Sequence, residues 1–341
     1  MSDHLTIADI ARLAEVSPAT VSRVINGQIG ARSKIKQRVM QVIEETGYQP
    51  NSVAQTLALQ RSSLIGLIFP NSVSSVLSQQ YYIKTIESVT LACNQHNYNL
   101  VLFLSQSAAD EEKVFAKVSR PGMLDGLIAN VGCLNGDRLI PLVKEAKIPV
   151  VLAGRNDALD AFSYVDIDNM HAAFNAVQHL LSLGRKRIAT ITGPLSVTDG
   201  CDRLEGYRRA LLGRGISVDE EIIVEGDYSE RTGYYAARRL LTKDIDGIFA
   251  ANDEMAIGAI RAVQEAGRSV PKDIAIIGFD DIAAASTMIP ALTTVRQPLG
   301  TFGNKLVELL IDRIEHPEKT PRKILLDTEL IIRQSCGEAI W

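Results

Sequence analysis

Small and polar side chains gather on one face of a short helix that we expect to begin at Pro18, and their types suit contact with DNA. Ser17 can cap this helix, and proline is favoured at a first helical position because its missing N–H costs nothing there. Val21, Val24 and Ile25 form an apolar inner face. The outer face holds Ala19, Thr20, Ser22, Arg23 and Asn26. A short helix with an arginine-bearing polar face is typical of the recognition helix of a helix-turn-helix, which contacts DNA.

A preceding helix must position this one. Thr6 can cap it, and Asp9 three residues later forms a shortened capping box. Apolar residues then recur at helical spacing at Ile7, Ile10, Ala11 and Ala14. The stretch from Thr6 to Asn26 therefore predicts two helices joined by a tight turn. Spacing alone leaves an alternative open, namely a helical hairpin that only builds a core.

A third helix is expected after Ser33, which can cap it, and Gly47 is a stop signal. Its apolar stripe comprises Ile35, Val39, Val42 and Ile43, and its basic cluster comprises Arg32, Lys34, Lys36 and Arg38. Up to Arg61 the chain carries a net charge of +2, against −6 for the remainder and −4 overall. A basic head on an acidic body favours a confined nucleic-acid contact, with phosphates beside the basic cluster, over a merely solvated charged face.

The pattern changes after Pro50. Residues 50–63 hold at most one or two helical turns, and such short helices are marginal in water unless a partner or DNA supports them. From Leu64, apolar runs cover residues 64–69, 99–104, 125–129, 149–153, 187–192, 246–251 and 273–279. They alternate with amphipathic stretches at 83–97, 170–183, 203–213, 231–241 and 253–266. This alternation predicts two α/β lobes with parallel sheets, and a ligand cleft beyond the carboxyl ends of the strands.

Signals for catalysis or metal binding are weak. GxSxG, the P-loop and a GxGxxG that opens a helix after a strand do not occur in the sequence, and the five histidines do not cluster. Cys93, Cys133, Cys201 and Cys336 are scattered, which favours free thiols over disulfides or zinc. With 46% hydrophobic residues the chain can bury sizeable cores, but no apolar run is long enough to span a bilayer and no signal peptide precedes Thr6. We expect a soluble cytoplasmic protein that is not an enzyme and has no metal or cofactor.

Over nearly its whole length the sequence resembles the lactose-repressor (LacI/GalR) family of bacterial transcription regulators. The resemblance rests on TIADIARLAEVSPATVSRVIN, GYQPN, VDIDN, LGRKRIATITGP, DRLEGYRRAL, FAANDEMAIGAI, IAIIGFDD and LTTVRQPLG. It implies an α/β fold with an N-terminal three-helix head (1–49), a hinge (50–63) and a two-lobed effector domain like the periplasmic binding proteins (64–341). The implied first lobe spans about 64–160 and 290–323, and the second about 161–289 and 324–341. The chain would cross between lobes near 157–163, near 287–292 and near Ile324.

The resemblance also implies a homodimer that binds a near-palindromic duplex DNA operator. On this pattern Pro18, Ala19 and Arg23 face bases, and Arg23 can bind a guanine through its fork. Thr6, Ser17, Thr20, Ser22 and Asn26 would contact phosphates. In the hinge, Leu57 matches a leucine that wedges between base pairs in the minor groove, and Ala54 matches the small residue near it; an ordinary apolar linker residue is the alternative for Leu57.

Carried over position by position, the resemblance implies an effector cleft for a sugar or sugar derivative. Its residues would be Asn130, Arg203, Tyr228, Asn252, Asp280 and Gln297, with Asp199 as a further acceptor and Arg155 as a chain-specific addition. A structural ion pair between Arg203 and Asp280 is the alternative for those two residues. Asp281, beside Asp280, is expected to cap the end of the strand and not to bind the effector. Several positions depart from the family pattern. Gly154 replaces an acid, so that Arg155 suggests an acidic or phosphorylated ligand, and Val197 argues against a nucleobase. A long polar loop, 71–80, leaves Tyr81 and Tyr82 as mere candidates for stacking on the ligand.

The leading hypothesis is therefore an allosteric repressor controlled by a small sugar-like effector. A regulator of the same family that depends on a corepressor or a partner phosphoprotein is the alternative, and a carrier-type sugar-binding protein or a sugar-processing enzyme is more remote.

Overall fold

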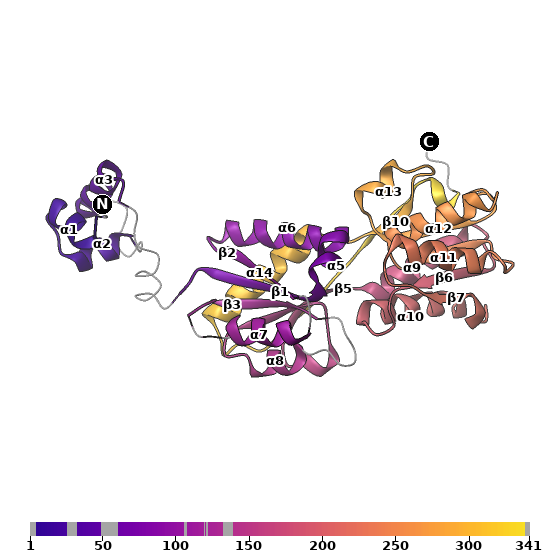
Figure 1. The fold of residues 1–341 in the computed structure, drawn as a ribbon, viewed down its shortest axis with the longest axis horizontal. Coiled ribbons are helices and arrows are strands. Elements are labelled where there is room, and N and C mark those ends of the chain that lie inside the picture. Colours follow the sequence, from indigo (N-terminus) through magenta and orange to yellow (C-terminus); the bar gives the residue numbers. More distant parts are fainter. Residues whose placement is uncertain are drawn as a thin grey trace. The chain divides into compact units, whose positions relative to one another are not determined.

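The computed structural model of the chain describes residues 5–25, 33–48, 61–105, 108–118, 120, 122–131 and 139–337. The chain divides into two compact units, Met1–Ser62 and Ser63–Trp341, which we call the head and the body. Both are drawn in Figure 1. Asn26, Ala54, Leu57 and Cys133 lie outside the described residues, as does most of the expected hinge.

The described head comprises three helices, α1 (Ile7–Leu13), α2 (Pro18–Ile25) and α3 (Lys34–Thr46). The expected caps are present on the first two. Thr6 and Asp9 form a reciprocal capping box, and the Ser17 hydroxyl accepts a hydrogen bond from the Thr20 backbone N–H at 3.2 Å. Gly47 ends α3 in the left-handed conformation, with φ of 62°. These local signals confirm the predicted helix-turn-helix and its third helix.

Two details of α3 differ from the sequence-based expectation. Ser33 occupies the N-cap position, but its side chain makes no capping hydrogen bond. Ile35 is 42% exposed, because the first turn of α3 extends past the small core of the head. Val39, further along the helix, is fully buried in that core. That core comprises Ile10, Ala11, Ala14, Val21, Val24 and Val39, with Val42 and Ile43 packed at its edge.

The body contains two six-stranded sheets, one in each lobe. The first has the order β11-β5-β4-β3-β1-β2 and is parallel throughout: β1 (Leu64–Ser72), β2 (Asn99–Ser105), β3 (Gly126–Asn130), β4 (Val150–Ala153), β5 (Ser163–Ile167), β11 (Lys323–Leu326). The second has the order β12-β10-β9-β8-β6-β7, with only β12 antiparallel: β6 (Ile188–Thr192), β7 (Ile223–Glu225), β8 (Gly247–Ala250), β9 (Ala275–Asp280), β10 (Thr293–Arg296), β12 (Glu329–Ile331). Most of these strands are buried on both faces, which explains their continuous apolar sequences.

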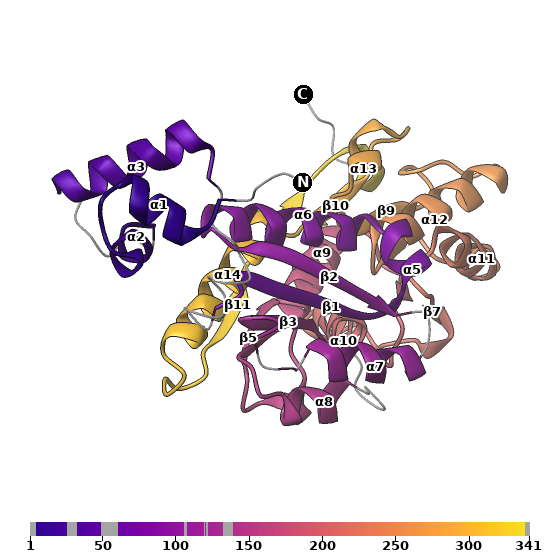
Figure 2. The ribbon, with the colours of Figure 1, turned by 60° about the vertical axis from the view of Figure 1, so that its left-hand side comes forward.

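Helices cover both faces of each sheet (Figure 1). The first lobe holds α5 (Val73–Ser78), α6 (Gln80–Gln95), α7 (Ala108–Val118), α8 (Leu139–Glu145), η1 (Asp157–Leu159) and α14 (Leu299–Glu315). The second holds α9 (Asn169–Ser182), α10 (Thr198–Leu212), η2 (Glu220–Ile222), α11 (Glu230–Leu240), α12 (Asp253–Glu265), α13 (Ala283–Thr287) and η3 (Gln334–Cys336). Within the described ranges, none of the helices combines the length and apolarity needed to cross a membrane. Figure 2 shows α6 and α14 on one face of the first sheet and α7 and α8 on the other.

The strand order moves the lobe boundaries from where the sequence placed them. Both β5 and β11 belong to the first sheet, and β10 belongs to the second, so the chain crosses after Ile167, after Arg296 and between Leu326 and Glu329. The stretches at 157–163 and 287–292, expected to be crossings, each lie within one lobe and lead into β5 and β10. The expected first and second lobes therefore exchange β5 and β10, and β11, most of which was expected in the second lobe, belongs to the first.

A second correction concerns the stretch from 71 to 80. The sequence suggested a long polar loop, but β1 extends to Ser72, and α5 and the start of α6 occupy the rest. Helix α5 buries Val76 against the core of the first lobe, which fixes the segment despite its serines. This packing holds the start of α6 at the carboxyl end of β1.

Candidate functional site

The outer face of α2 presents the residues that the sequence assigned to DNA contact. Pro18, Ala19 and Arg23 are exposed, whereas Val21 and Val24 are buried beneath them. The Arg23 Nε atom lies 3.3 Å from the backbone oxygen of Ala19, so the guanidinium lies along the outer face of the helix. Thr6 and Ser17 are also exposed, while Thr20 and Ser22 are half-buried. All described members of the set lie at or near the surface of the helix-turn-helix.

Arg38 has a different position from the one expected. The sequence grouped it with the cations that contact phosphates, but its guanidinium donates a hydrogen bond to the backbone oxygen of Glu15 at 3.2 Å and lies 3.6 Å from that residue's carboxylate. Glu15 has a φ of 50°, which is unusual for a residue with a side chain. Arg38 therefore braces the turn between α1 and α2, which sets the angle of the recognition helix.

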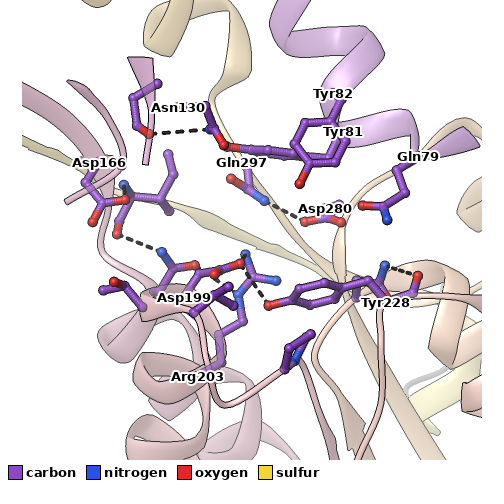
Figure 3. A pocket seen from close by; sticks show the side chains of 18 of the residues that line it. Gln79, Tyr81, Tyr82, Asn130, Asp166, Asp199, Arg203, Tyr228, Asp280 and Gln297 are labelled. Atoms are coloured by element: carbon purple, nitrogen blue, oxygen red, sulfur yellow. Dashed lines mark hydrogen bonds and ion pairs between the residues drawn. The ribbon is translucent and has the colours of Figure 1, made fainter. Parts of the chain in front are cut away.

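In the body, a cavity of 220 Å³ lies where the carboxyl ends of the strands of both sheets converge. All eight residues that the sequence assigned to the effector cleft line it: Asn130, Arg155, Asp199, Arg203, Tyr228, Asn252, Asp280 and Gln297. Figure 3 shows α6 side chains on one side of the cavity and α10 side chains on the other. The crossing segments bring the two lobes together here, since Gln297 directly follows β10.

Arg203 lies on α10, and its side chain is buried, with only 5% of the residue exposed. Its Nε donates to Asn169 Oδ1 at 2.9 Å, and its Nη1 donates to the backbone oxygen of Ala251. The guanidinium lies 3.7 Å from the centre of the Phe279 ring, an arrangement in which the ring face attracts the cation. Among the described residues, its ion-pair contact is Asp199, at 4.0 Å, and the alternative pairing with Asp280 is not formed.

Tyr228 and Asp199 form a second fixed group. The Tyr228 hydroxyl donates to Asp199 Oδ2 at 2.8 Å, and burial raises the Tyr228 pKa well above its ordinary value of 10.0. Gly193 makes room for the ring, because a Cβ at this position would lie 2.1 Å from the Tyr228 oxygen. Tyr228 itself has a φ of 67°. A strained backbone conformation of this kind is maintained by its surroundings and concentrates at binding sites.

Asp280 lies at the end of β9 and accepts a hydrogen bond from Gln297 Nε2 at 2.5 Å. Burial raises its pKa to about 7, although the Arg203 guanidinium acts in the opposite direction. Asp280 and Asp281 both have positive φ values, 110° and 55°. Asp281 forms ion pairs with Arg296 at 2.7 Å and Arg333 at 2.6 Å. These pairs anchor the strained turn, a stronger role than the strand-end capping considered from the sequence.

Asn252 serves mainly to hold other groups in place. Its Oδ1 accepts from the Met255 N–H and caps α12, while its Nδ2 donates to the backbone oxygen of Tyr228 and to Glu254 Oε2. A side-chain amide has two donor hydrogens and two acceptor lone pairs, so only one lone pair remains for a ligand. The predicted direct contact is thereby limited to a single hydrogen bond.

The aromatic side of the cavity is formed by Tyr81 and Tyr82 on α6, so the structure places both candidates in the site. Their rings meet edge to face at 5.3 Å, and Tyr82 meets Phe69 in the same manner at 5.2 Å. In Figure 3 both rings lie on the side of the cavity opposite Tyr228. Aromatic rings on opposite sides can cover the apolar faces of a flat ring ligand.

Arg155 is not available as a simple anion ligand. Its Nη2 donates to both carboxylate oxygens of Asp202 at 2.5 Å, and its Nε lies 3.5 Å from Asp166 Oδ2. The two arginines that line the cavity face five carboxyl groups there: Asp166, Asp199, Asp227, Glu254 and Asp280. The acidic or phosphorylated ligand suggested by Arg155 alone is disfavoured by this surplus of carboxyl groups.

Sequence reasoning missed several polar lining residues, namely Ser75, Gln79, Asp166, Asn169, Thr198, Asp227 and Glu254. Asp166 and Asn169 lie in the VDIDN motif, directly around the first crossing, so correct placement of that crossing would have found them. Gln79 lies in the stretch that was expected to be a loop, and nothing in that sequence indicated a residue of the cavity. No cluster of three or more metal-ligating side chains is found in the part of the chain that the structure describes.

Comparison with known proteins places these features in context. Residues 6–51 match the model for bacterial regulatory proteins of the lacI family, and residues 177–336 match that of a periplasmic binding protein-like domain. The chain is 34% identical over 334 residues to the HTH-type transcriptional regulator CelR of Thermobifida fusca, covering 97% of this chain and 98% of that protein.

Solved structures agree with this match. A CelR–cellobiose complex superposes with a TM-score of 0.77 at 34% identity, covering 97% of this chain and 99% of the other. A lac repressor dimer bound to operator and the anti-inducer ONPF superposes with a TM-score of 0.83 at 27% identity, again over 97% of this chain and 99% of the other. The similarity therefore extends over the head, the body and the cavity between the lobes.

Proposed function

Because this chain belongs to the lacI family of bacterial regulatory proteins, which are DNA-binding transcription regulators and not enzymes, we propose that it is a repressor controlled by a sugar or sugar derivative. It binds a palindromic operator as a homodimer, and the effector occupies the cleft of the body. Its site of action is the cytoplasm, where the operator DNA lies.

The lining of the cleft is the observation that carries this proposal. It combines guanidinium, carboxyl, amide and phenol groups that converge from both lobes on one cavity. Carboxyl and amide groups make paired hydrogen bonds to neighbouring hydroxyls, and aromatic rings cover the apolar face of a sugar ring. The cellobiose complex of CelR, which is 34% identical to this chain, supports the same class of ligand.

The proposal assigns residues 1–49 to operator contact, 50–63 to a hinge and 64–341 to effector binding and dimerisation. Pro18, Ala19 and Arg23 face bases, while Thr6, Ser17, Thr20, Ser22 and Asn26 contact phosphates. In the hinge, Leu57 wedges between base pairs beside Ala54, and the unstacking it causes is offset by further contacts with the bent duplex. A short hinge helix is marginal alone, so a small change in the spacing of the two body subunits suffices to melt it.

Two measurements test the function. Selection from random duplexes should yield a palindromic operator, whose binding weakens steeply with salt by about 0.9 log units in affinity per log unit of salt for each neutralised phosphate. A thermal-shift screen that starts with cellobiose and other neutral sugars should give a ligand that stabilises the body and weakens operator binding. A chain that stays monomeric and binds no symmetric duplex at low salt would contradict the proposal. A sugar that strengthens operator binding would instead identify a corepressor.

The hinge has its own test. Leu57→Ala should weaken operator binding and leave the effector affinity unchanged, because the wedge acts only on DNA. A loss of effector affinity in this variant would contradict the assignment of the hinge.

A further inference from the structure

Arg155 connects the two lobes at one edge of the cleft. It follows β4 in the first lobe, whereas its hydrogen-bond partner Asp202 lies on α10 in the second. The backbone oxygen of Arg155 also accepts a hydrogen bond from the Thr198 hydroxyl at 3.2 Å, and Thr198 begins α10. Side-chain and backbone atoms of one residue thus tie β4 to α10.

The preceding residue explains why this position carries the cation. Gly154 has a φ of 92°, and a Cβ there would lie 2.8 Å from the backbone oxygen of Val131. A side chain at 154 is therefore strained in two ways. The first side chain after β4 that can reach across the cleft is Arg155, and the turn at Gly154 directs it toward α10.

The positive charge of Arg155 is already paired with carboxyl groups of the protein. Asp202 and Asp166 both contact its guanidinium, and their side chains are only 18% and 10% exposed. One cation held between two partly buried carboxyl groups has no uncompensated positive charge to offer a ligand. An anionic ligand would have to displace Asp202 from Arg155 and would then lie near Asp166 and Asp199, which also line the cavity.

Arg203 provides no substitute. Its nitrogens bind Asn169, Ala251 and Asp199, and its flat face covers Phe279. Both cations that line the cavity are therefore committed to groups of the protein.

We propose that Arg155 is a clasp between the lobes, and that this use of its charge makes the cleft accept uncharged effectors and reject phosphorylated or carboxylated ones. The proposal refines the sugar-responsive function given above and rests on it. It identifies Arg155, Asp202 and Asp166 as the residues that set the charge selectivity of the site.

Asp202→Asn in the full-length protein tests this assignment. Asparagine keeps the shape and removes the carboxylate, so the Arg155 guanidinium can bind an anion. The probe is inorganic phosphate, measured by calorimetry and by thermal midpoint at constant ionic strength, with chloride as the reference anion. Charge-assisted hydrogen bonds are worth about 1.5–3 kcal/mol, so we expect phosphate affinity to rise roughly ten- to a hundredfold over the wild type. Adding Arg155→Gln should abolish that gain.

Asp219→Asn is the matched control, because Asp219 pairs with Arg187 at 2.8 Å on the surface of the same lobe. It frees an arginine outside the cleft and should produce no saturable phosphate binding. If Asp202→Asn does not fold, Asp166→Asn releases the same guanidinium from its other partner and should show a smaller gain.

The outcomes separate the clasp from the proposed function. Saturable phosphate binding by the wild type that Arg155→Gln removes would overturn the clasp, even if sugars bind as proposed. The absence of any gain in both Asp202→Asn and Asp166→Asn would also overturn it. If the gain occurs and no sugar binds the wild type, the clasp stands and the proposed effector class fails.

Discussion

Asp280→Asn should make the body more stable at neutral pH than the wild type, by an amount that depends on pH. The carboxyl of Asp280 lies at the end of β9, where burial raises its pKa from an ordinary 3.8 to about 7. Asparagine has nearly the same shape, and its carbonyl oxygen can accept the hydrogen bond that Gln297 donates to Asp280. The substitution therefore removes the ionisation and keeps the contact.

The magnitude follows from the two pKa values. Raising a carboxyl pKa from 3.8 to about 7 corresponds to on the order of 4 kcal/mol at a pH above both values. Between these values the folded state holds a proton that the unfolded state has released, so the wild type loses stability as the pH rises. Over the range from about pH 5 to pH 8 the expected loss is about 2–3 kcal/mol, and the asparagine variant escapes it.

Urea unfolding of both proteins, followed by circular dichroism at several pH values, measures this difference. Asp166 also has a pKa raised to about 7, but it is present in both proteins and its contribution cancels in the comparison. We expect the stability advantage of Asp280→Asn to grow between pH 5 and about pH 7 and then to level off. An advantage that stays constant with pH would refute the argument that burial raises the pKa of Asp280.

Three further predictions concern the head and the cleft. Thr6→Ala removes the capping box of α1 and should lower the stability of the head by about 1 kcal/mol, measured by amide hydrogen exchange in α1; unchanged exchange would show that the cap is dispensable. Arg23→Ala should cost about 1–3 kcal/mol of operator affinity and relax the preference at one base pair, measured by anisotropy on substituted duplexes, whereas a uniform loss on all sequences would make Arg23 a phosphate contact. Arg203→Gln should abolish the effector response while operator binding persists, and should cost the body about 1–3 kcal/mol because the buried oxygens of Asn169 and Ala251 lose their hydrogen-bond donor; a normal response would remove Arg203 from the effector site.

The head was predictable in detail because its signals are local. The capping box, the Ser17–Pro18 start and the Gly47 stop each act within four residues, and each is present in the structure. Ile35 shows where such reasoning fails. Helical spacing assigns it to the apolar stripe, but whether a residue at a helix end meets the core depends on where the neighbouring helices end.

The strands of the body were predictable only where their sequences form continuous apolar runs. The continuous apolar runs gave β1, β2, β3, β4, β6, β8 and β9, whereas β5, β7, β10, β11 and β12 were not predicted as strands. The sequences SYVDI, TTVR, KILL and ELI are short and partly polar, because these strands lie near sheet edges or at the crossings. The misplaced lobe boundaries follow directly from these missing strands.

The cleft residues were found by resemblance, but their roles were not, since the roles depend on partners distant in sequence. Arg155 and Asp202 are 47 positions apart, and Tyr228 and Asp199 are 29 apart. Nothing in the sequence around Arg155 indicates that its charge is taken up by the other lobe. The inference of an acidic ligand was therefore reasonable for an isolated arginine and is disfavoured by the pair.

One helix links the cavity of the body to the contact between the lobes. The first two turns of α10 carry Thr198 and Asp202, which bind Arg155 of the other lobe, and Asp199 and Arg203, which line the cavity. In a helix, residues three or four positions apart lie on one face, so these four groups move together as a rigid body. A ligand that moves the start of α10 through Asp199 or Arg203 therefore shifts the partners of Arg155 as well. Because a ligand shifts an equilibrium only through differential contacts with two states, α10 is the element through which occupancy of the cleft can change the closure of the lobes.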